Sequence, residues 1–434
     1  MPGPTSLISS HSFNSYAAVK GENWPQPPGA DAFAGLAGDV VRGIEPFSEA
    51  DPVALLVNFL IAFGSAVGSG ARFMVGPTQH HPREFAALVG DTAKARKGDS
   101  WAAVSSLFRL VDPEWAATNA NGLSTGEGLI HAVRDPLVKR EPVKSAGRTV
   151  DYEDVIVDHG VADKRLLVVE AEFAKVLRVV ERQGNSLSPV LRSAWDTGDL
   201  RVMTRANPIL ATGAHISMLV HVTIEELKRE LSDVSTANGF ANRFMWFAVR
   251  RSKLLPEPEP FEGKAVNSLV YSVSRSLAAA KEIGELKRDS AARELWAAVY
   301  AELSDGKNGL AAALLARAEA HVLRLSMVYA LLDASPVVRL DHLTAAIELW
   351  SYSERSVAHI FGDSMGDPVG DTILRALRNT EYLTRTEISS SLFGRNQTAA
   401  RIDGSLQALL ELHLVEVGTE ETDGRPREIW RAKP

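Results

Sequence analysis

The sequence predicts an α/β protein with a parallel sheet, followed by a helical segment and a small C-terminal winged helix. Between residues 76 and 255, short apolar runs of strand length alternate with helical patterns, which is typical of a doubly wound parallel sheet. After the proline-rich stretch 253–260 the apolar residues recur with the helical period of 3.6. The last segment, 366–434, shows three short helices and a β-hairpin.

Composition restricts the class of protein. The chain has 434 residues, of which 45% are hydrophobic and 23% charged, values of a folded protein with two or three domains. The absence of cysteine excludes disulfides, thiolate zinc sites and thiol nucleophiles. A net charge of −7 argues mildly against nucleic-acid binding by the whole chain, while a local basic patch stays open. No apolar run reaches the roughly 18–20 residues of a membrane span, and the first residues lack a signal peptide. We therefore expect a cytoplasmic protein without a membrane partner.

The first part of the chain is predicted to hold a flexible arm, two helices and a strand. Proline, glycine and serine dominate the arm. Asp51 and Pro52 supply an N-cap and a first-turn proline for the second helix. His80 and His81 form an adjacent pair, which is too few ligands for a metal site, so we interpret them as loop histidines. The four elements are at residues 1–30, 31–44, 51–67 and 72–75.

The stretch 85–100 has the layout of a phosphate-binding loop. A buried strand from Phe85 to Val89 precedes a small, basic loop, and a helical pattern follows from Trp101. In such loops backbone N–H groups at a helix N-terminus bind an anion and a lysine reaches the terminal phosphates. The spacing departs from G-x-x-x-x-G-K-[ST], because Gly90 lies seven residues before Lys97, so a plain strand-to-helix turn is the alternative. The candidate cofactor-binding residues are Gly90, Thr92, Lys94, Arg96, Lys97, Gly98, Asp99 and Ser100.

Acidic residues follow this loop at two places. Glu127 lies in a glycine-rich stretch, 121–130, which either aims a side chain at a ligand or is an ordinary helix N-terminus. The apolar strand 165–173 ends in Glu170 and Glu172. Two carboxylates at the end of a buried strand are what a magnesium–nucleotide site needs, which favours the phosphate-loop interpretation.

The remainder of the predicted core adds two strands and one insertion. Residues 134–164 are polar and mixed in charge, and indicate an irregular insertion or an exposed hairpin. His221 lies near the end of a strand at 216–223, and Arg243 immediately precedes a further apolar strand. Additional helices are predicted at residues 171–182, 187–195 and 224–231.

Beyond the linker, everything up to about residue 361 is predicted to be helical. Arg317 and Arg324 lie two turns apart on the third of these helices. We expect them to be solvated or paired with Glu319, and a role near phosphate is the alternative. The helices are predicted at residues 266–283, 290–303, 310–332 and 340–360.

The C-terminal segment predicts a winged helix with a basic face. Helices at 371–377, 384–392 and 397–412 precede two strands around the pair Asp423-Gly424, a strong hairpin signal. The third helix would enter a DNA major groove while the wing contacts phosphates; a protein-interaction domain is the alternative. The candidate DNA-binding residues are Arg395, Arg401, Arg425, Arg427 and Arg431.

Five stretches together resemble a known family. They are Gly90–Ser100, Leu166–Phe173, Gly184–Arg192, Ala211–Ser217 and Asn238–Phe244. The sequence is similar there to RecA-like P-loop ATPases catalogued as a domain of unknown function, which are associated with phage and plasmid primase-helicase proteins. The likeness spans roughly residues 30–430. It implies an N-terminal helical part at 31–75, a RecA-like core at 76–255, a helical domain at 262–362 and a winged helix at 366–434.

The resemblance also implies roles for individual residues and the cofactors ATP and Mg²⁺. Lys97 would bind phosphate, Ser100 and Glu170 would hold the metal, and Glu172 would be an accessory acid. The resemblance further implies three catalytic roles: a water-polarising Glu127, a phosphate-sensing His221, and Arg243 as an arginine finger for a neighbouring subunit.

The leading hypothesis is therefore an ATP-binding and ATP-hydrolysing, helicase- or translocase-like protein of a mobile genetic element, acting in DNA replication. It would form a ring, contact DNA through the winged helix and work with a primase or another replication protein. The shifted glycine and the glutamate at the strand end leave open a slow or binding-only site. The alternatives are a nucleotide-switched, sequence-specific DNA-binding initiator or regulator with little turnover, and a structural oligomer with an inactive nucleotide site.

Overall fold

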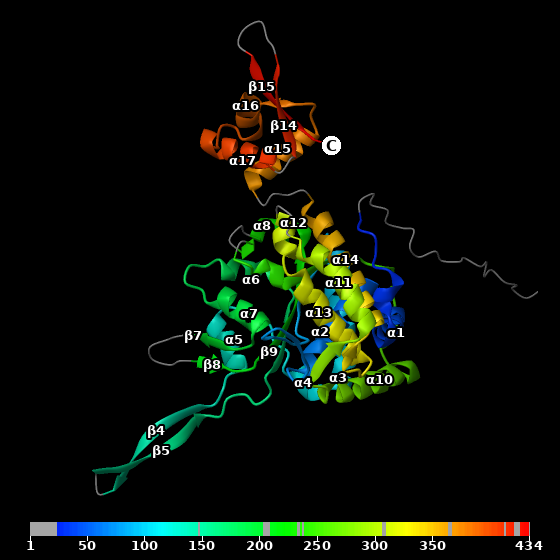
Figure 1. Cartoon of the computed structure of the whole chain (residues 1–434), viewed down its shortest axis with the longest axis vertical. Helices are drawn as coiled ribbons and strands as arrows, with labels where there is room; N and C mark the ends of the chain where they lie inside the picture. Colours follow the sequence, from blue (N-terminus) through cyan, green and yellow to red (C-terminus); the bar gives the residue numbers. More distant parts are fainter. Residues whose placement is uncertain are drawn as a thin grey trace, which may run out of the picture.

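The computed structural model describes residues 24–145, 148–202, 209–231, 235–236, 238–305, 310–362, 367–411, 414–420 and 426–433. Most of the predicted arm, residues 1–23, and the candidate Arg425 lie outside this described part. The body of the molecule carries a projecting hairpin at one end and a small C-terminal unit at the other (Figure 1). None of the described helices has the length and apolar character needed to cross a membrane.

A four-stranded parallel sheet lies at the centre of the body, in the order β10-β3-β9-β6. All three strand pairings are parallel. Every residue of β3 is buried, as expected of a strand with helices on both faces. The α/β prediction with a parallel sheet is thus confirmed. The strands are β3 (Phe85–Gly90), β6 (Arg165–Glu170), β9 (His215–Thr223) and β10 (Phe244–Ala248).

Helices cover both faces of this sheet (Figure 1). On one face Val104 of α3 packs in the same cluster as Ala86 of β3 and the residues of α2. On the other face Leu227 of α8 packs with Val220 of β9 and with α5, α6 and α7. Helix α2 is buried nearly all round because it lies between the sheet and other helices. The helices are α2 (Pro52–Val67), α3 (Lys97–Val111), α4 (Pro113–Ala117), α5 (Gly126–Ala132), α6 (Phe173–Val180), α7 (Leu187–Asp196) and α8 (Ile224–Glu230).

The N-terminal helices and the later helical segment share one hydrophobic core with the α2 face of the sheet. The predicted helix 310–332 is interrupted, because a turn at 316–317 separates α12 from α13. The elements of this layer are η1 (Ala30–Phe33), α1 (Gly35–Ile44), η2 (Glu45–Phe47), α10 (Lys264–Lys281), α11 (Ser290–Ser304), α12 (Leu310–Leu315), α13 (Ala318–Leu332) and α14 (Leu340–Phe361).

A second, mixed sheet corrects one prediction. The segment 262–361 is not entirely helical, because β11 (Glu285–Arg288) and β12 (Val337–Val338) pair in parallel with each other. Strand β11 also pairs with β1 (Arg72–Val75), which in turn pairs with β2 (Thr78–His80). Strand β1 lies where the sequence predicted it. Strands β2, β11 and β12 are only two to four residues long, so they carry too little periodicity to be read from the sequence.

The polar insertion is an exposed hairpin, one of the two predicted outcomes. Its strands, β4 (Leu137–Ser145) and β5 (Arg148–Asp158), form an antiparallel two-stranded sheet. It extends well away from the body (Figure 1). A shorter pair, β7 (Leu200–Val202) and β8 (Ile209–Ala211), lies nearby.

The C-terminal unit has its own small core. The three predicted helices and the hairpin are confirmed, and a short strand, β13, extends the hairpin into a sheet of order β13-β15-β14. The elements are α15 (Pro368–Arg378), β13 (Leu383–Thr384), α16 (Arg385–Glu387) with η5 (Ile388–Leu392), α17 (Ala399–Glu411), β14 (Val415–Glu420) and β15 (Arg427–Ala432).

Candidate functional site

The carboxyl ends of β3 and β9 form a topological switch point. The chain leaves β3 for α3 on one face of the sheet, and leaves the neighbouring strand β9 for α8 on the other. In open α/β sheets such a divergence opens a crevice at the strand ends, where ligands bind. Gly90 and Thr223 lie side by side there in the strand register. The predicted phosphate loop therefore lies at this edge of the sheet.

The loop from Gly90 to Lys97 is closely packed. A Cβ atom on Gly90 would lie 2.5 Å from the Cβ of Ala95 and 2.9 Å from Nζ of Lys97, so this position requires glycine. Arg96, directly before α3, has a φ of 58°, in the left-handed region that favours glycine. The backbone thus adopts, one residue before Lys97, the conformation for which the usual loop sequence supplies glycine.

The N-terminus of α3 is uncapped and open. Arg96 provides no side-chain cap, and the first N–H groups of a helix have no intrahelical partners. The Cβ position of Gly98 faces open space within 4 Å. Free N–H groups, open space and the helix dipole together favour an anion at this end.

Lys97 and His221 meet at this edge. Lys97 is 8% exposed, and its Nζ donates to the carbonyl oxygen of Thr92 at 3.1 Å. Burial lowers the pKa of Lys97, against the opposite effect of the carboxylates of Glu226 and Asp91. Burial and the charge of Lys97 lower the pKa of His221 to about 4, so this imidazole is neutral at pH 7. Its Nε2 is buried without a hydrogen-bond partner among the described residues, which leaves it available to a ligand.

Two residues here were missed in the sequence. Thr223 ends β9 and caps α8, and the carboxylate of Glu226 accepts from both the N–H and the hydroxyl of Thr223. Those two hydrogen bonds lower the pKa of Glu226. The spacing T-x-x-E directly after an apolar strand is a capping-box signal, so this arrangement was readable. It places a fixed carboxylate near Lys97.

A cavity of about 500 Å³ extends from the loop along α3. Asp99, Ala103 and Ser106 line one side, and Phe47 and Phe261 line the other, with their rings 5.5 Å apart in an edge-to-face contact. The residues after β10, predicted as a linker, contribute prolines and Leu255 to the wall. The cavity is thus mostly apolar and opens beside the anion-binding end of α3.

Arg96 belongs to this cavity as well as to the loop. Its Nε lies 2.6 Å from Glu49 and its Nη1 lies 3.4 Å from Asp99. The backbone N–H of Leu255 is the largest contribution that lowers the pKa of Glu49. The guanidinium of Arg96 therefore faces the cavity. Lys94 is exposed on the opposite part of the loop, without an ion pair among the residues that the structure describes.

The magnesium role of Ser100 stays a prediction, and the hydroxyl is engaged with protein groups in this structure. Its hydroxyl donates to the carbonyl oxygen of Lys97 at 2.6 Å and accepts from Nδ2 of Asn58 at 2.8 Å. Ser100 has no exposed surface. Its side chain points toward α2, to which Asn58 belongs.

The predicted acids do not converge on the loop. Glu170 pairs in register with Val220, so its side chain shares the face of Val220 and lies on the face opposite His221. Its Oε1 accepts from the backbone N–H of Leu123 at 2.7 Å. Glu172 is exposed and pairs with Lys175. Glu127 accepts from the Ser186 hydroxyl at 2.7 Å, beside a separate cavity of about 250 Å³.

Arg243 lies at the amino end of the parallel strands, opposite to the end that carries Lys97. It precedes the first residue of β10, whereas Lys97 follows the last residue of the parallel strand β3. Its guanidinium contacts Asp196 at 2.6 and 3.2 Å and donates to the carbonyl oxygen of Gly239. Its side chain is 7% exposed. An arginine-finger role stays a prediction, and would require this pair to open.

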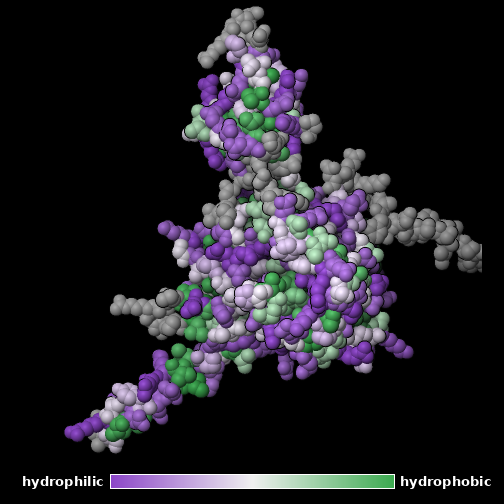
Figure 2. Space-filling view, in the orientation of Figure 1, coloured by the Kyte–Doolittle hydropathy of each residue, from purple (hydrophilic) through white to green (hydrophobic). Residues whose placement is uncertain are grey.

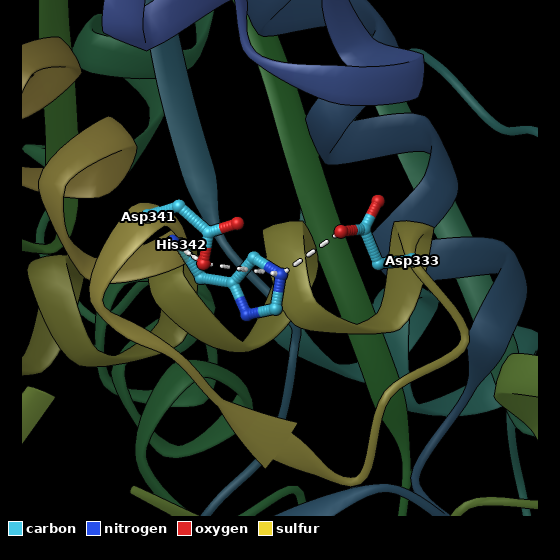
Figure 3. Close-up of side chains that lie close together, drawn as sticks. All are labelled: Asp333, Asp341 and His342. Carbon is cyan, nitrogen blue, oxygen red and sulfur yellow. Dashed lines mark hydrogen bonds and ion pairs between the residues drawn. The ribbon is translucent and has the colours of Figure 1, made fainter. Parts of the chain in front are cut away.

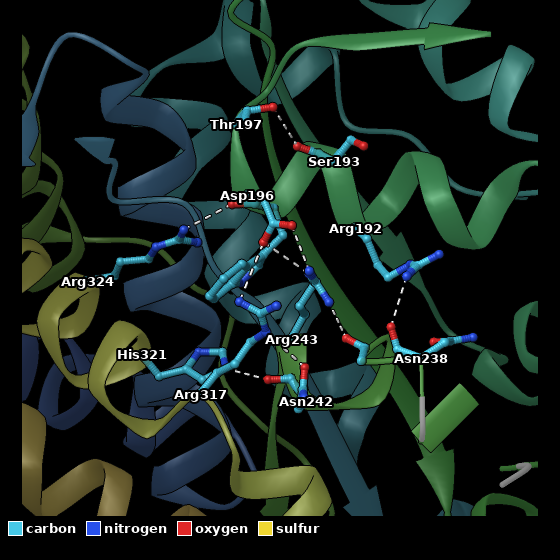
Figure 4. Close-up of polar contacts among 12 residues, drawn as sticks. Arg192, Ser193, Asp196, Thr197, Asn238, Asn242, Arg243, Arg317, His321 and Arg324 are labelled. Atoms are coloured by element: carbon cyan, nitrogen blue, oxygen red, sulfur yellow. Dashed lines mark hydrogen bonds and ion pairs between the residues drawn. The ribbon is translucent and has the colours of Figure 1, made fainter. Parts of the chain in front are cut away.

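Arg243 is part of a larger arginine cluster around the ring of Trp195 (Figure 4). Arg324 is 1% exposed and donates to the carbonyl oxygens of Arg83 and Trp195 at 3.1 and 3.0 Å. Arg317 contacts Asp196 at 3.7 Å. The prediction that Arg317 and Arg324 are solvated or paired with Glu319 is therefore wrong for Arg324, whereas the side chain of Arg317 is 33% exposed. Arg324 is held by the carbonyl oxygen of Trp195 at the end of α7, as helix C-termini favour, whereas Arg243 and Arg317 contact the carboxylate of Asp196.

A group of possible metal ligands lies elsewhere, at the start of α14 (Figure 3). Nδ1 of His342 accepts from the backbone N–H of Arg339 at 3.1 Å, so the ring proton is on Nε2, 3.1 Å from Asp333. The guanidinium of Arg339 also lies 2.6 and 3.4 Å from Asp333 and Asp341. The guanidinium of Arg339 thus already forms ion pairs with both carboxylates. We therefore interpret the group as a cap of the helix and not as a metal site.

The candidate DNA-binding arginines are only partly free. Arg401 pairs with Asp367 and Arg427 with Glu420. Arg395 and Arg431 are exposed without an ion pair in the described part of the chain. Residues 366–434 contain eleven acidic and nine basic residues, so the segment as a whole has no excess of positive charge.

Comparison of the sequence with models of known protein families gives no match, and no curated protein matches it significantly. The resemblance to RecA-like ATPases thus stays a prediction.

Proposed function

We propose that this chain binds ATP with Mg²⁺ at the carboxyl end of β3 and hydrolyses it slowly. The observation that carries the proposal is that Lys97, the open N-terminus of α3 and the unpartnered Nε2 of His221 lie together at the carboxyl ends of β3 and β9. A lysine, free backbone N–H groups and a neutral imidazole are donors for phosphate oxygens. Glycine at position 90 allows the loop to close around them.

The adjacent cavity supports a nucleotide over a simple anion. Its volume of about 500 Å³ is in the range of small-molecule sites. Its aromatic and proline walls suit a flat base. The cavity begins at Arg96, directly before α3, and runs along that helix to Ser106. The carboxylates of Asp99 and Glu259 in its lining would accept hydrogen bonds from a base that carries an amino group.

We expect slow hydrolysis because the predicted acidic residues do not converge on the loop. Glu170 lies on the other face of the sheet and Ser100 is occupied, so neither completes a magnesium and water site at the loop. This favours the nucleotide-switched initiator or regulator over the helicase- or translocase-like motor that the resemblance implies. In both proposals the C-terminal unit contacts DNA as a winged helix, through Arg395, Arg431 and α17.

The test measures ATP binding and turnover in the full chain, with and without DNA. We expect Mg²⁺-ATP to raise the melting temperature and turnover to be about 10⁻² s⁻¹ or less, as in nucleotide switches without a completing partner. Strong stimulation by any single-stranded DNA would favour the motor. Tight binding to one duplex sequence with unchanged turnover would favour the regulator. No effect of ATP on melting would contradict nucleotide binding.

A further inference from the structure

The β4–β5 hairpin is a long arm with almost no cover. Of its strand residues only Val143, Val155 and Asp158 are half-buried, and all the others are exposed. It pairs with no third strand and projects into solvent (Figure 1). A two-stranded hairpin without packing is marginally stable in water. Its extended form is therefore best explained by a surface that covers it.

The strand register gives the hairpin two different faces. Side chains alternate between faces along each strand, so directly opposed residues share a face. Val138, Tyr152 and Ile156 on the first face are 50%, 53% and 52% exposed, and apolar residues are visible along the arm in Figure 2. The first face carries the pairs Val138–Ile156, Arg140–Asp154 and Pro142–Tyr152; the second carries Lys139–Val155, Glu141–Glu153 and Val143–Asp151.

Charge distinguishes the two faces. The first face has one cation and one anion directly opposite, Arg140 and Asp154, and the structure records no ion pair between them, although both are described. The second face sets Glu141 against Glu153, which is unfavourable between neighbouring strands unless water solvates both groups. The second face thus suits solvent, and the first suits a partner surface with matching apolar and charged positions.

We propose that the first face docks on the same face of a second copy of this chain. A two-fold axis that runs along the arm, between its strands, places β4 of one copy over β5 of the other. At each level the register then sets Val138 over the partner's Ile156, and Arg140 over the partner's Asp154. The face is self-complementary in this orientation. An axis across the strands, centred on this pair, would instead place Arg140 over the partner's Arg140.

The size of the face sets the strength of the contact. Strands of 9 and 11 residues, at about 3.3 Å per residue and about 5 Å between strands, offer roughly 300 Å² on each copy. Standard interfaces bury about 800 Å² per partner. The arm therefore forms a reversible dimer that dissociates on dilution. This contact is independent of the nucleotide site.

The test is sedimentation equilibrium of the full chain over a range of concentrations. Arg140→Glu makes the pair at 140 and 154 acidic on both sides and Asp154→Arg makes it basic on both sides, and each variant alone is expected to dimerise at least about tenfold more weakly than wild type. An equimolar mixture of the two should restore dimerisation, because each acidic arm then faces a basic one. Lys139→Glu, on the second face, is the matched control and should leave dimerisation unchanged.

The mixing experiment distinguishes a lost contact between copies from damage within one arm. Each variant keeps two like charges opposite each other in its own arm, so mixing can restore dimerisation only through contacts between copies. The absence of natural cysteine adds a geometric readout. Facing sheets lie about 10 Å apart, which is too far for a direct disulfide. A bifunctional thiol reagent about 8 Å long should therefore join Val138→Cys to Ile156→Cys in a mixture, and should not join Lys139→Cys to Val155→Cys.

Three results would overturn the proposal: a wild-type chain that stays monomeric at all concentrations, a dimer that neither charge variant weakens, or a mixture that fails to recover. If Arg140→Glu instead weakens DNA binding of a monomeric wild-type chain, the arm is a nucleic-acid contact and the proposal is wrong.

Discussion

Replacement of Lys97 by alanine is expected to weaken ATP binding about 100-fold. The ammonium group lies at the mouth of the loop, where it now donates to Thr92, and a phosphate would take over this donor. Losing a charge-assisted hydrogen bond costs about 1.5–3 kcal/mol, and each 1.4 kcal/mol corresponds to a tenfold change in affinity. Calorimetric titration with Mg²⁺-ATP measures the effect.

Lys94→Ala is the matched control for this variant. It removes the same group from the same loop, but Lys94 is exposed and its side chain makes no contact that the structure records. Its effect on ATP affinity should be within about threefold, as for a screened surface charge. Equal losses in the two variants would show that only the net charge of the loop matters. A larger loss for Lys94→Ala would transfer the phosphate role to that residue.

The second large effect concerns stability. Glu84→Gln is expected to lower the free energy of unfolding by about 3–5 kcal/mol. Glu84 is 1% exposed, and its Oε2 accepts from Nε1 of Trp195 at 3.1 Å and from Nδ1 of His321 at 2.9 Å. Burial lowers the pKa of Arg83 to about 9 and that of Arg324 to about 10, so both stay charged at pH 7. Glutamine keeps the shape but removes the carboxylate charge that balances them.

Urea unfolding at pH 7 measures this loss. Glu225→Gln is the control, since Glu225 has an 89% exposed side chain and should change the free energy by no more than about 0.5 kcal/mol. A loss below about 1 kcal/mol for Glu84→Gln would show that carbonyl oxygens alone compensate the buried arginines.

The sequence predicted the elements where the signal is local. The apolar run at 85–89 gave β3, and the pair Asp51-Pro52 gave the start of α2, where the Asp51 side chain accepts from the N–H of Val53. The Asp-Gly pair and its flanking strands gave the C-terminal hairpin. These features depend on neighbouring residues, which is why they could be read without the fold.

The errors concern contacts between distant segments. Arg324 was expected to be solvated or paired with Glu319, but its two Nη groups donate to the carbonyl oxygens of Arg83 and Trp195, more than 100 residues away. The magnesium role of Ser100 came from the resemblance, whereas in the structure its hydroxyl bonds to Lys97 and Asn58. The direction of the Ser100 side chain depends on its contact with Asn58 of α2. The sequence of the loop alone does not reveal that contact. Glu170 was placed correctly at a strand end, but its face depends on the register with β9.

The central claim is that nucleotide phosphates bind between β3 and β9 at the start of α3. A crystal structure of the full chain with Mg²⁺ and a non-hydrolysable ATP analogue tests it most directly. The account predicts terminal phosphate oxygens within hydrogen-bonding distance of Lys97 Nζ, the N–H of Gly98 and Nε2 of His221, with the base beside Phe47 and Phe261. An analogue bound elsewhere, or phosphates beside Lys94 with Lys97 still on Thr92, would contradict it.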